Sequence, residues 1–349
     1  MSYRYRTILS TLVDKLQNLI NAFKTRVATD SGTLEGEAFI KPLLQSISGV
    51  LTSLVLLTPN AWKTSILYTI LQNNGSTDFG FVRATSATRV REDGLIESVG
   101  NNIPRLDWLN GYPQILIEPQ ATNLLLRSEE FDNAYWLKTR GNITPNLMTA
   151  PNGSLTADAF YGDTTSGQHS VRINFPYVSG NTYTASIFVK KGVKATFEIV
   201  MSFTAFGGAW RRAIFNLDTG TLVGYNTNSG VVPKIVEFLN GWYLCSFTNI
   251  CTTSISDDLF FTDLFTANIG TTDLYFYLWG AQLELGTTAS TYIPTTTATV
   301  TRNADIATLA PPVGTTEIIE TVNGVDNTIT TIPTTYQIPN GRIDKILMK

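Results

Sequence analysis

The chain has 349 residues, of which 43% are hydrophobic and only 15% are charged, and its formal net charge is −3. This balance excludes a disordered chain, and the lack of clustered Lys and Arg argues against a nucleic-acid partner. The best apolar run, residues 50–57, is far shorter than the roughly 20 residues of a membrane-spanning helix, so no membrane insertion is expected.

An amphipathic helix is predicted over residues 8–27. Its apolar residues recur at steps of three and four, as in a short coiled coil: Leu9, Leu12, Leu16, Leu19 and Phe23. Because about two to three heptads are too few for a stable isolated coiled coil, the helix either packs on its own domain or forms a bundle on a symmetry axis. We expect residues 1–48 to form one helical segment.

Residues 49–305 are dominated by strand-sized runs separated by turns. Residues 181–190 and 195–203 alternate apolar and polar side chains, as strands with one buried face do. The dipeptide Asn240-Gly241 between two apolar runs predicts a β-hairpin. Many strands without intervening helices indicate a mainly β fold, and specifically a jelly-roll β-sandwich.

Both cysteines, Cys245 and Cys251, lie in one predicted strand. Six residues of strand span about 20 Å, which is too far for a disulfide, so both are expected to be free, buried thiols. Free thiols are consistent with assembly in a reducing cytoplasm.

Residues 306–349 are predicted to form a separate, small C-terminal β meander after a linker at Pro311-Pro312. The pairs Asn323-Gly324 and Asn340-Gly341 each predict a hairpin turn. A meander of this size buries little surface alone, so we expect it to pack on the sandwich or on neighbouring chains.

Little in the sequence points to catalysis. His169 is the only histidine, so a Ser-His-Asp or Cys-His system would have to use it. Adjacent carboxylates such as Asp257-Asp258 point to opposite faces of a strand, whereas a glycosidase needs two that flank one bond. We expect no enzyme activity and keep polysaccharide cleavage as the weakest alternative.

A carbohydrate-binding site requires fewer specific residues than a catalytic site. Sugars stack on the faces of aromatic rings, while amides and carboxylates hydrogen bond to their hydroxyls. The candidate stacking residues are Trp210, Trp242 and Trp279, each of which would otherwise belong to the core. Trp210 follows a Gly-Gly turn and is expected to be the most exposed of the three.

Two stretches of the chain resemble a known family. The first contains Phe79-Gly-Phe-Val-Arg, Ile103-Pro-Arg-Leu-Asp-Trp and Ile117-Glu-Pro-Gln-Ala-Thr-Asn. The second contains Trp279-Gly-Ala-Gln-Leu-Glu-Leu-Gly and Ala289-Ser-Thr-Tyr-Ile-Pro-Thr-Thr-Thr-Ala-Thr-Val-Thr-Arg. Over roughly residues 50–305 the chain is similar to bacteriophage head-spike and tail-fibre proteins with a concanavalin-like, carbohydrate-binding jelly roll.

This resemblance implies a structural protein of the virion surface that is made in the bacterial host cytoplasm and assembles as a homotrimer. It implies attachment through the N-terminal segment to other virion proteins of the capsid, penton or tail. It also implies adhesion to surface carbohydrate of the host or the environment. A second interpretation stays open, namely a purely structural decoration or connector protein that binds no glycan.

The segment Asn123-Leu-Leu-Leu-Arg-Ser-Glu-Glu-Phe also resembles the first strand of carbohydrate-binding modules, in which a Glu helps to hold a structural calcium ion. The resemblance nominates Glu130, with Gln282 from the last strand, as ligands of the oxygen type that calcium prefers. The paired Asp common in that last strand is missing from Trp279-Gly-Ala-Gln, which argues against calcium. No other cofactor is expected.

Overall fold

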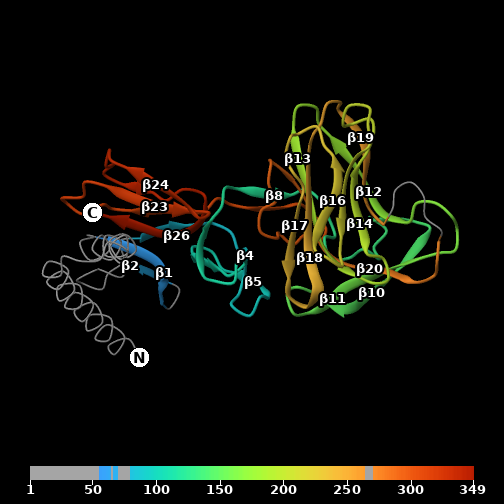
Figure 1. Cartoon of the computed structure of the whole chain (residues 1–349), viewed down its shortest axis with the longest axis horizontal. Coiled ribbons are helices and arrows are strands. Elements are labelled where there is room, and N and C mark those ends of the chain that lie inside the picture. Colours follow the sequence, from blue (N-terminus) through green and yellow to red (C-terminus); the bar gives the residue numbers. More distant parts are fainter. Residues whose placement is uncertain (1–54, 64–65, 70–78, 264–269) are drawn as a thin grey trace, which may run out of the picture.

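The computed structural model describes residues 55–63, 66–69, 79–263 and 270–349. In this part of the chain nearly all regular structure is antiparallel β-sheet, so the predicted mainly β fold is confirmed. The strands form two units joined by a narrow junction (Figure 1). The predicted helical segment, with its apolar stripe, lies outside the described residues.

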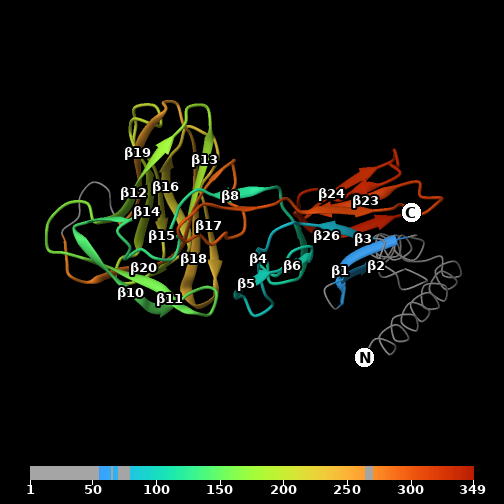
Figure 2. The same cartoon turned by 180° about the vertical axis from the view of Figure 1, so that it is seen from behind.

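The larger unit, here the sandwich unit, consists of two antiparallel sheets that face each other (Figures 1 and 2). Sheet I has the order β10 (Gly141–Thr149), β11 (Leu155–Gly162), β20 (Leu274–Leu285), β13 (Thr182–Lys191), β18 (Trp242–Ile250) and β17 (Lys234–Phe238). Sheet II has the order β16 (Thr221–Asn226), β15 (Arg211–Asn216), β14 (Thr196–Met201), β19 (Ile255–Thr262), β12 (Ser170–Tyr177) and β9 (Leu137–Thr139).

The core between the sheets is built from one face of each strand, as the alternation predicts. In sheet I the buried residues Ala185, Ile187 and Val189 of β13 contribute to it. In sheet II the equivalent face of β14 contributes Phe197 and Ile199, which are fully buried. The intervening side chains of β13 therefore point to the outer face of sheet I.

The smaller unit, here the base unit, is assembled from two stretches far apart in the sequence. Its main sheet has the order β2 (Ile66–Thr69), β1 (Val55–Lys63), β26 (Gly341–Met348), β23 (Ile318–Val322) and β24 (Val325–Ile329), with β7 (Gln114–Ile117) on β26 and β6 (Arg105–Asp107) on β7. A second sheet joins β25 (Tyr336–Gln337), β22 (Ile306–Leu309) and β3 (Phe79–Val82), and β4 (Ala87–Val90) pairs with β5 (Ile96–Val99).

The pairing of these strands corrects the predicted domain boundaries. We predicted a sandwich over 49–305 and a separate unit over 306–349. The strands before residue 118 instead pair with those after residue 305, as in Ile306↔Val82 and Arg342↔Leu116. The buried residues of both stretches share one hydrophobic core, with Ile115, Ile318 and Ile343 at its centre.

Two of the three predicted Asn-Gly turns are hairpins. Asn240-Gly241 joins β17 to β18 through a short 3-10 turn (Leu239–Gly241), and Asn323-Gly324 joins β23 to β24. The third prediction, Asn340-Gly341, is wrong, because β25 pairs with β22 while β26 pairs with β1, β7 and β23. Long-range pairing therefore overrides the local turn signal there.

The junction consists of two chain crossings that pair with each other. β8 (Ala121–Asn123) leads into the sandwich unit and β21 (Val300–Arg302) leads out, with Asn123 opposite Val300. The side-chain amide of Asn123 donates to the carbonyl oxygens of Ala281 and Ile293, at 3.1 and 2.9 Å. The sandwich unit is thus an insertion between two adjacent strands (Figure 1).

Candidate functional site

A cavity of about 210 Å³ lies on the outer face of sheet I, where the base unit meets it. Sheet I supplies the outward-facing residues of β13, β17 and β18, among them Ser186, Lys234 and Ser246. The base unit supplies residues of β4 and β5, together with Asp107 and Arg342. The cavity is below the roughly 300–1,000 Å³ of typical small-molecule sites, so it suits a ligand of about one ring.

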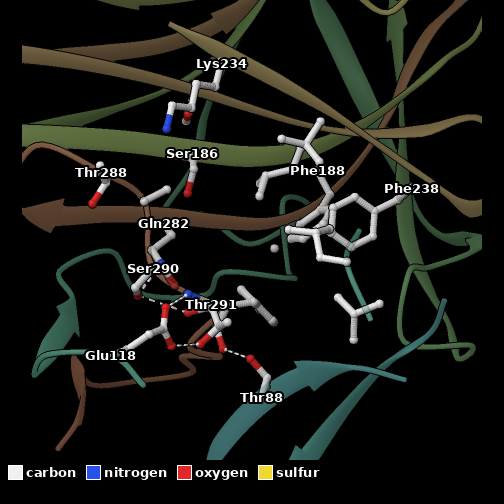
Figure 3. A pocket seen from close by; sticks show the side chains of 18 of the residues that line it. Thr88, Glu118, Ser186, Phe188, Lys234, Phe238, Gln282, Thr288, Ser290 and Thr291 are labelled. Carbon is white, nitrogen blue, oxygen red and sulfur yellow. Dashed lines mark hydrogen bonds between the residues drawn. The ribbon is translucent and has the colours of Figure 1, made fainter. Parts of the chain in front are cut away.

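One wall of the cavity is apolar and aromatic. Phe188 of β13 and Phe238 of β17 meet edge to face, with their ring centroids 5.0 Å apart. Figure 3 shows Phe188 and Phe238 side by side on this wall. Val236 and Leu244 also line the cavity, as does Tyr292 from the loop after β20. A β-bulge at Gly280, with φ +64°, lets the rings of Phe188 and Tyr292 approach the strand where a Cβ atom would lie within 3.2 Å of both.

The other wall is polar. Hydroxyl groups of Ser186, Ser246 and Thr288 line it, and Figure 3 shows Ser186 and Thr288 on the side away from the two phenylalanines. Gln282 lies below them and is already engaged, because its Oε1 accepts from the backbone N–H of Ile293 at 2.7 Å. An aromatic wall facing free hydroxyls can hold an amphipathic ring such as a sugar.

Beneath the polar wall lies a buried network of charged side chains. Arg83 and Arg105 both bind Asp305, and Arg105 also binds Glu118 at 2.8 Å. Arg302 lies 3.5 Å from the same Glu118 carboxylate. Four of these residues belong to the motifs that carry the family resemblance, and Asp305 follows the last motif by three positions. The motifs therefore hold the junction together through these ion pairs, and Glu118 and Gln282 of the same motifs also line the cavity.

Electrostatics keeps Glu118 ionised. Burial alone would raise its pKa, but Arg105, Arg302 and the hydrogen bonds from Thr291 outweigh burial and lower the pKa to about 2. Glu284, which lies behind the same wall, behaves differently. Burial raises its pKa, although it accepts hydrogen bonds from Ser290 and Gln282.

The three tryptophans nominated from the sequence do not share a site. Trp242 and Trp279 are 2% and 1% exposed, and their Nε1 atoms donate to Thr149 O and Thr156 Oγ1. Neither presents a ring face, so the stacking role predicted for them is wrong in this structure. Trp210 is 39% exposed and packs against Phe203 and Phe260 beside sheet II, away from the cavity.

The residues nominated for calcium engage protein partners. Glu130 forms an ion pair with Arg127 at 2.8 Å, whereas Gln282 is buried in the sheet I network. Among the residues that the structure describes, no group of three or more His, Cys, Asp or Glu side chains is arranged to hold a metal ion. Both nominated side chains therefore have protein partners, and the calcium site stays a prediction.

The remaining chemical candidates are structural. Cys245 and Cys251 are free and buried, as predicted. His169 is fully buried, and its ring nitrogens contact Gly167 O at 2.9 Å and Asp163 O at 3.1 Å. In the described part of the chain no helix has the length and apolar character of a membrane span.

Sequence reasoning named Gln282, which lines the cavity, but it missed the cavity residues of β17. Alternate residues of β17 face opposite sides of the sheet. One side carries Lys234, Val236 and Phe238 and lines the cavity, while Ile235 on the other side packs on the core. That alternation was a usable signal for an outward face. It could not show that the base unit would cover part of this face and turn it into a cavity.

Comparison with known proteins gives only weak likenesses. No protein-family model matches the chain, and no curated protein matches it. The enzymatically active domain of bacteriophage CBA120 tailspike protein 4 is 11% identical over 47% of this chain, with a TM-score of 0.28, and the match spans 21% of the tailspike chain.

Two further solved structures match similar lengths. The C-terminal family 22 carbohydrate-binding module of Clostridium thermocellum Xyn10B is 15% identical over 49% of this chain and 98% of its own, with a TM-score of 0.30. The K2 adhesin domain of Lys-gingipain is 12% identical over 48% of this chain and 96% of its own, with a TM-score of 0.25. Similarities this low assign no function.

Proposed function

We propose that this chain is a bacteriophage head or tail fibre or spike that binds surface glycans through the cavity on sheet I. The observation that carries the binding role is the cavity itself, where the Phe188–Phe238 wall faces the hydroxyls of Ser186, Ser246 and Thr288. The virion role is supported by the motif resemblance over residues 50–305. On this proposal the base unit and N-terminal segment attach to the particle and the sandwich unit meets the glycan.

Binding without cleavage is part of this proposal. The carboxylates that line the cavity are Glu118 and Asp107, and both are ion paired with arginines. A general acid must carry a proton near neutral pH, and Glu118, with a pKa of about 2, does not. This pairing supports a role for the two carboxylates in structure and ligand positioning.

Trimeric assembly and attachment through residues 1–48 belong to the proposal as well. The apolar stripe of Leu9, Leu12, Leu16, Leu19 and Phe23 is the feature that supports them. The molar mass of the full chain in solution, measured by light scattering before and after Leu16→Asp, tests this part. A trimer that survives the substitution would place the symmetry axis elsewhere.

The binding role is tested with a glycan array and with host cells, using the full chain. Ser246→Phe should fill the cavity and weaken binding by about tenfold or more, since one displaced ring contact is worth roughly 1.4 kcal/mol. Trp210→Ala is the matched variant, because it removes the exposed aromatic ring beside sheet II and should leave binding unchanged.

Each outcome of this experiment points to one interpretation. Loss of binding in Ser246→Phe alone supports the cavity. Loss in Trp210→Ala alone would move the site to sheet II. If the unmodified chain binds neither glycans nor cells, the alternative of a structural connector protein becomes the better account.

A further inference from the structure

Most charged side chains that line the cavity have ion-pair partners, but one does not. Asp107 binds Arg342 at 3.0 Å, and Arg89 binds Glu97 at 2.6 Å. Lys234 also lines the cavity, and within the described residues its amino group has neither an ion-pair partner nor a hydrogen-bond acceptor. Lys234 therefore carries an unpaired positive charge at the cavity.

The buried network behind the cavity does not compensate Lys234. It contains three arginines, Arg83, Arg105 and Arg302, and the carboxyl groups of Asp305, Glu118 and Glu284. Ion pairs connect the arginines to Asp305 and Glu118, so the charges of these two carboxylates are already neutralised. Glu284 has no ion pair, but its carboxyl group accepts hydrogen bonds from Ser290 and Gln282 and is thus engaged by groups other than Lys234.

The position of Lys234 suits contact with a ligand. β17 is the edge strand of sheet I, and the alternation along it places Lys234, Val236 and Phe238 on the cavity side. Figure 3 shows the Lys234 side chain reaching toward Ser186, on the polar side of the cavity and away from Phe238. An ammonium group at this point can donate to a ligand whose ring lies on the phenylalanine wall.

We infer that the glycan bound here is acidic, a sugar ring with one carboxylate of the uronic-acid type, and that Lys234 pairs with that carboxylate. This inference rests on the proposed glycan-binding function. The ring packs on Phe188 and Phe238, the carboxylate meets Lys234, and Ser186, Ser246 and Thr288 bond to the ring hydroxyls. The charge of the whole chain, −3, provides no general attraction for polyanions, so selectivity for an acid comes from this one side chain.

The test compares matched ligands with matched variants of the full chain. The ligands are a uronic-acid oligosaccharide, the same oligosaccharide with its carboxyl groups reduced to alcohols, and a sulfated oligosaccharide. The variants are Lys234→Gln, which removes the charge, Lys234→Arg, which keeps it, and Lys190→Gln. Lys190 is a matched control because it lies on β13 of the same sheet but outside the cavity lining.

We expect the acid to bind about tenfold more tightly than its reduced form, as a partly solvated charge-assisted hydrogen bond provides. Lys234→Gln should abolish that preference and its dependence on salt, while Lys234→Arg and Lys190→Gln should keep both. Tighter binding of the sulfated ligand than of the uronate would overturn the assignment of a carboxylate.

Equal binding of acid and reduced forms, unchanged in Lys234→Gln, would overturn the inference and leave glycan binding intact. If no glycan of either kind binds, the proposed function itself fails. The two failures are therefore distinguishable in one experiment.

Discussion

The sandwich unit and the base unit are both antiparallel β structures, but they are stabilised in different ways. The sandwich unit is one continuous stretch whose facing sheets share an apolar core that includes Phe197, Phe261 and Phe276. The base unit joins two stretches more than 180 residues apart, and its junction side is held by buried charges around Arg105 and Asp305. The base unit has its own apolar core around Ile115, Ile318 and Ile343, and it adds an ion network whose members come from both stretches of the chain.

The largest expected effect comes from breaking that network. Arg105→Ala removes one partner and leaves Asp305 and Glu118 as buried carboxylates with fewer cations, which should cost about 3–5 kcal/mol of unfolding free energy. Amide hydrogen exchange should show faster opening at Leu116 of the base unit and little change at Ile187 of the sandwich unit.

The matched control is Arg91→Ala. Arg91 pairs with Asp93 at the surface, where its side chain is 45% exposed, so the change in stability should stay within about 0.5 kcal/mol. Equal effects of the two substitutions, or equal loss of protection in both units, would contradict the distinction between them.

The pH dependence of stability should have opposite signs in the two units. The pKa of Glu118 is lowered to about 2, below its ordinary 4.5. The stabilisation of the folded state by its ionised carboxylate is therefore present above pH 4.5 and is lost as pH falls toward 2. Burial raises the pKa of Asp158 in β11 from 3.8 to about 6, despite hydrogen bonds from the Asn146 and Phe131 N–H groups. Its contribution is present below pH 3.8 and is lost as pH rises through 6.

Each shift corresponds to an effect of up to about 3 kcal/mol. Hydrogen exchange between about pH 3 and pH 7 should show the base unit losing protection on acidification and the β11 region losing it on alkalinisation. Glu118→Gln and Asp158→Asn should flatten the respective slopes. A slope of the same sign in both regions would show that other groups dominate.

The smallest expected effect compares the two Asn-Gly hairpins. Gly241 in the sandwich unit and Gly324 in the base unit both have φ +75°, and an added Cβ would meet nothing within 4 Å at either. Ala at each position should therefore cost only the backbone penalty of about 1–2 kcal/mol, measured by urea denaturation. Asn in place of Ala should recover part of the loss, and a much larger cost at one site would reveal a contact specific to that turn.

Local patterns predicted the strands of the sandwich, although they placed its start at residue 49 instead of after residue 118. The alternation in β13 placed Ala185, Ile187 and Val189 on the core face, and Asn240-Gly241 joins strands that pair directly. The base unit could not be predicted in this way, because its register depends on partners such as Arg342↔Leu116. Nothing in the local sequence at Asn340-Gly341 shows that β26 does not pair with β25.

The candidate site was less predictable than the fold. Trp242 and Trp279 were nominated because tryptophan rings can stack on sugars. In the structure they are buried in an apolar cluster that also contains Phe188 and Tyr292. Lys234 has an ordinary sequence context, and its importance depends on the pairing of every other charge in the cavity. Such a property arises only when residues from β17, β18 and the base unit are brought together.

The pairing of Asn123 with Val300 also has an evolutionary consequence. Because the chain enters and leaves the sandwich unit on neighbouring strands, residues 124–299 form a cassette whose two ends are fixed at one place. Recombination that replaces this cassette with another sandwich would leave the pairings of the base unit unchanged. Because sheet I and the base unit each supply part of the cavity lining, such an exchange would also replace the sheet I side of the cavity.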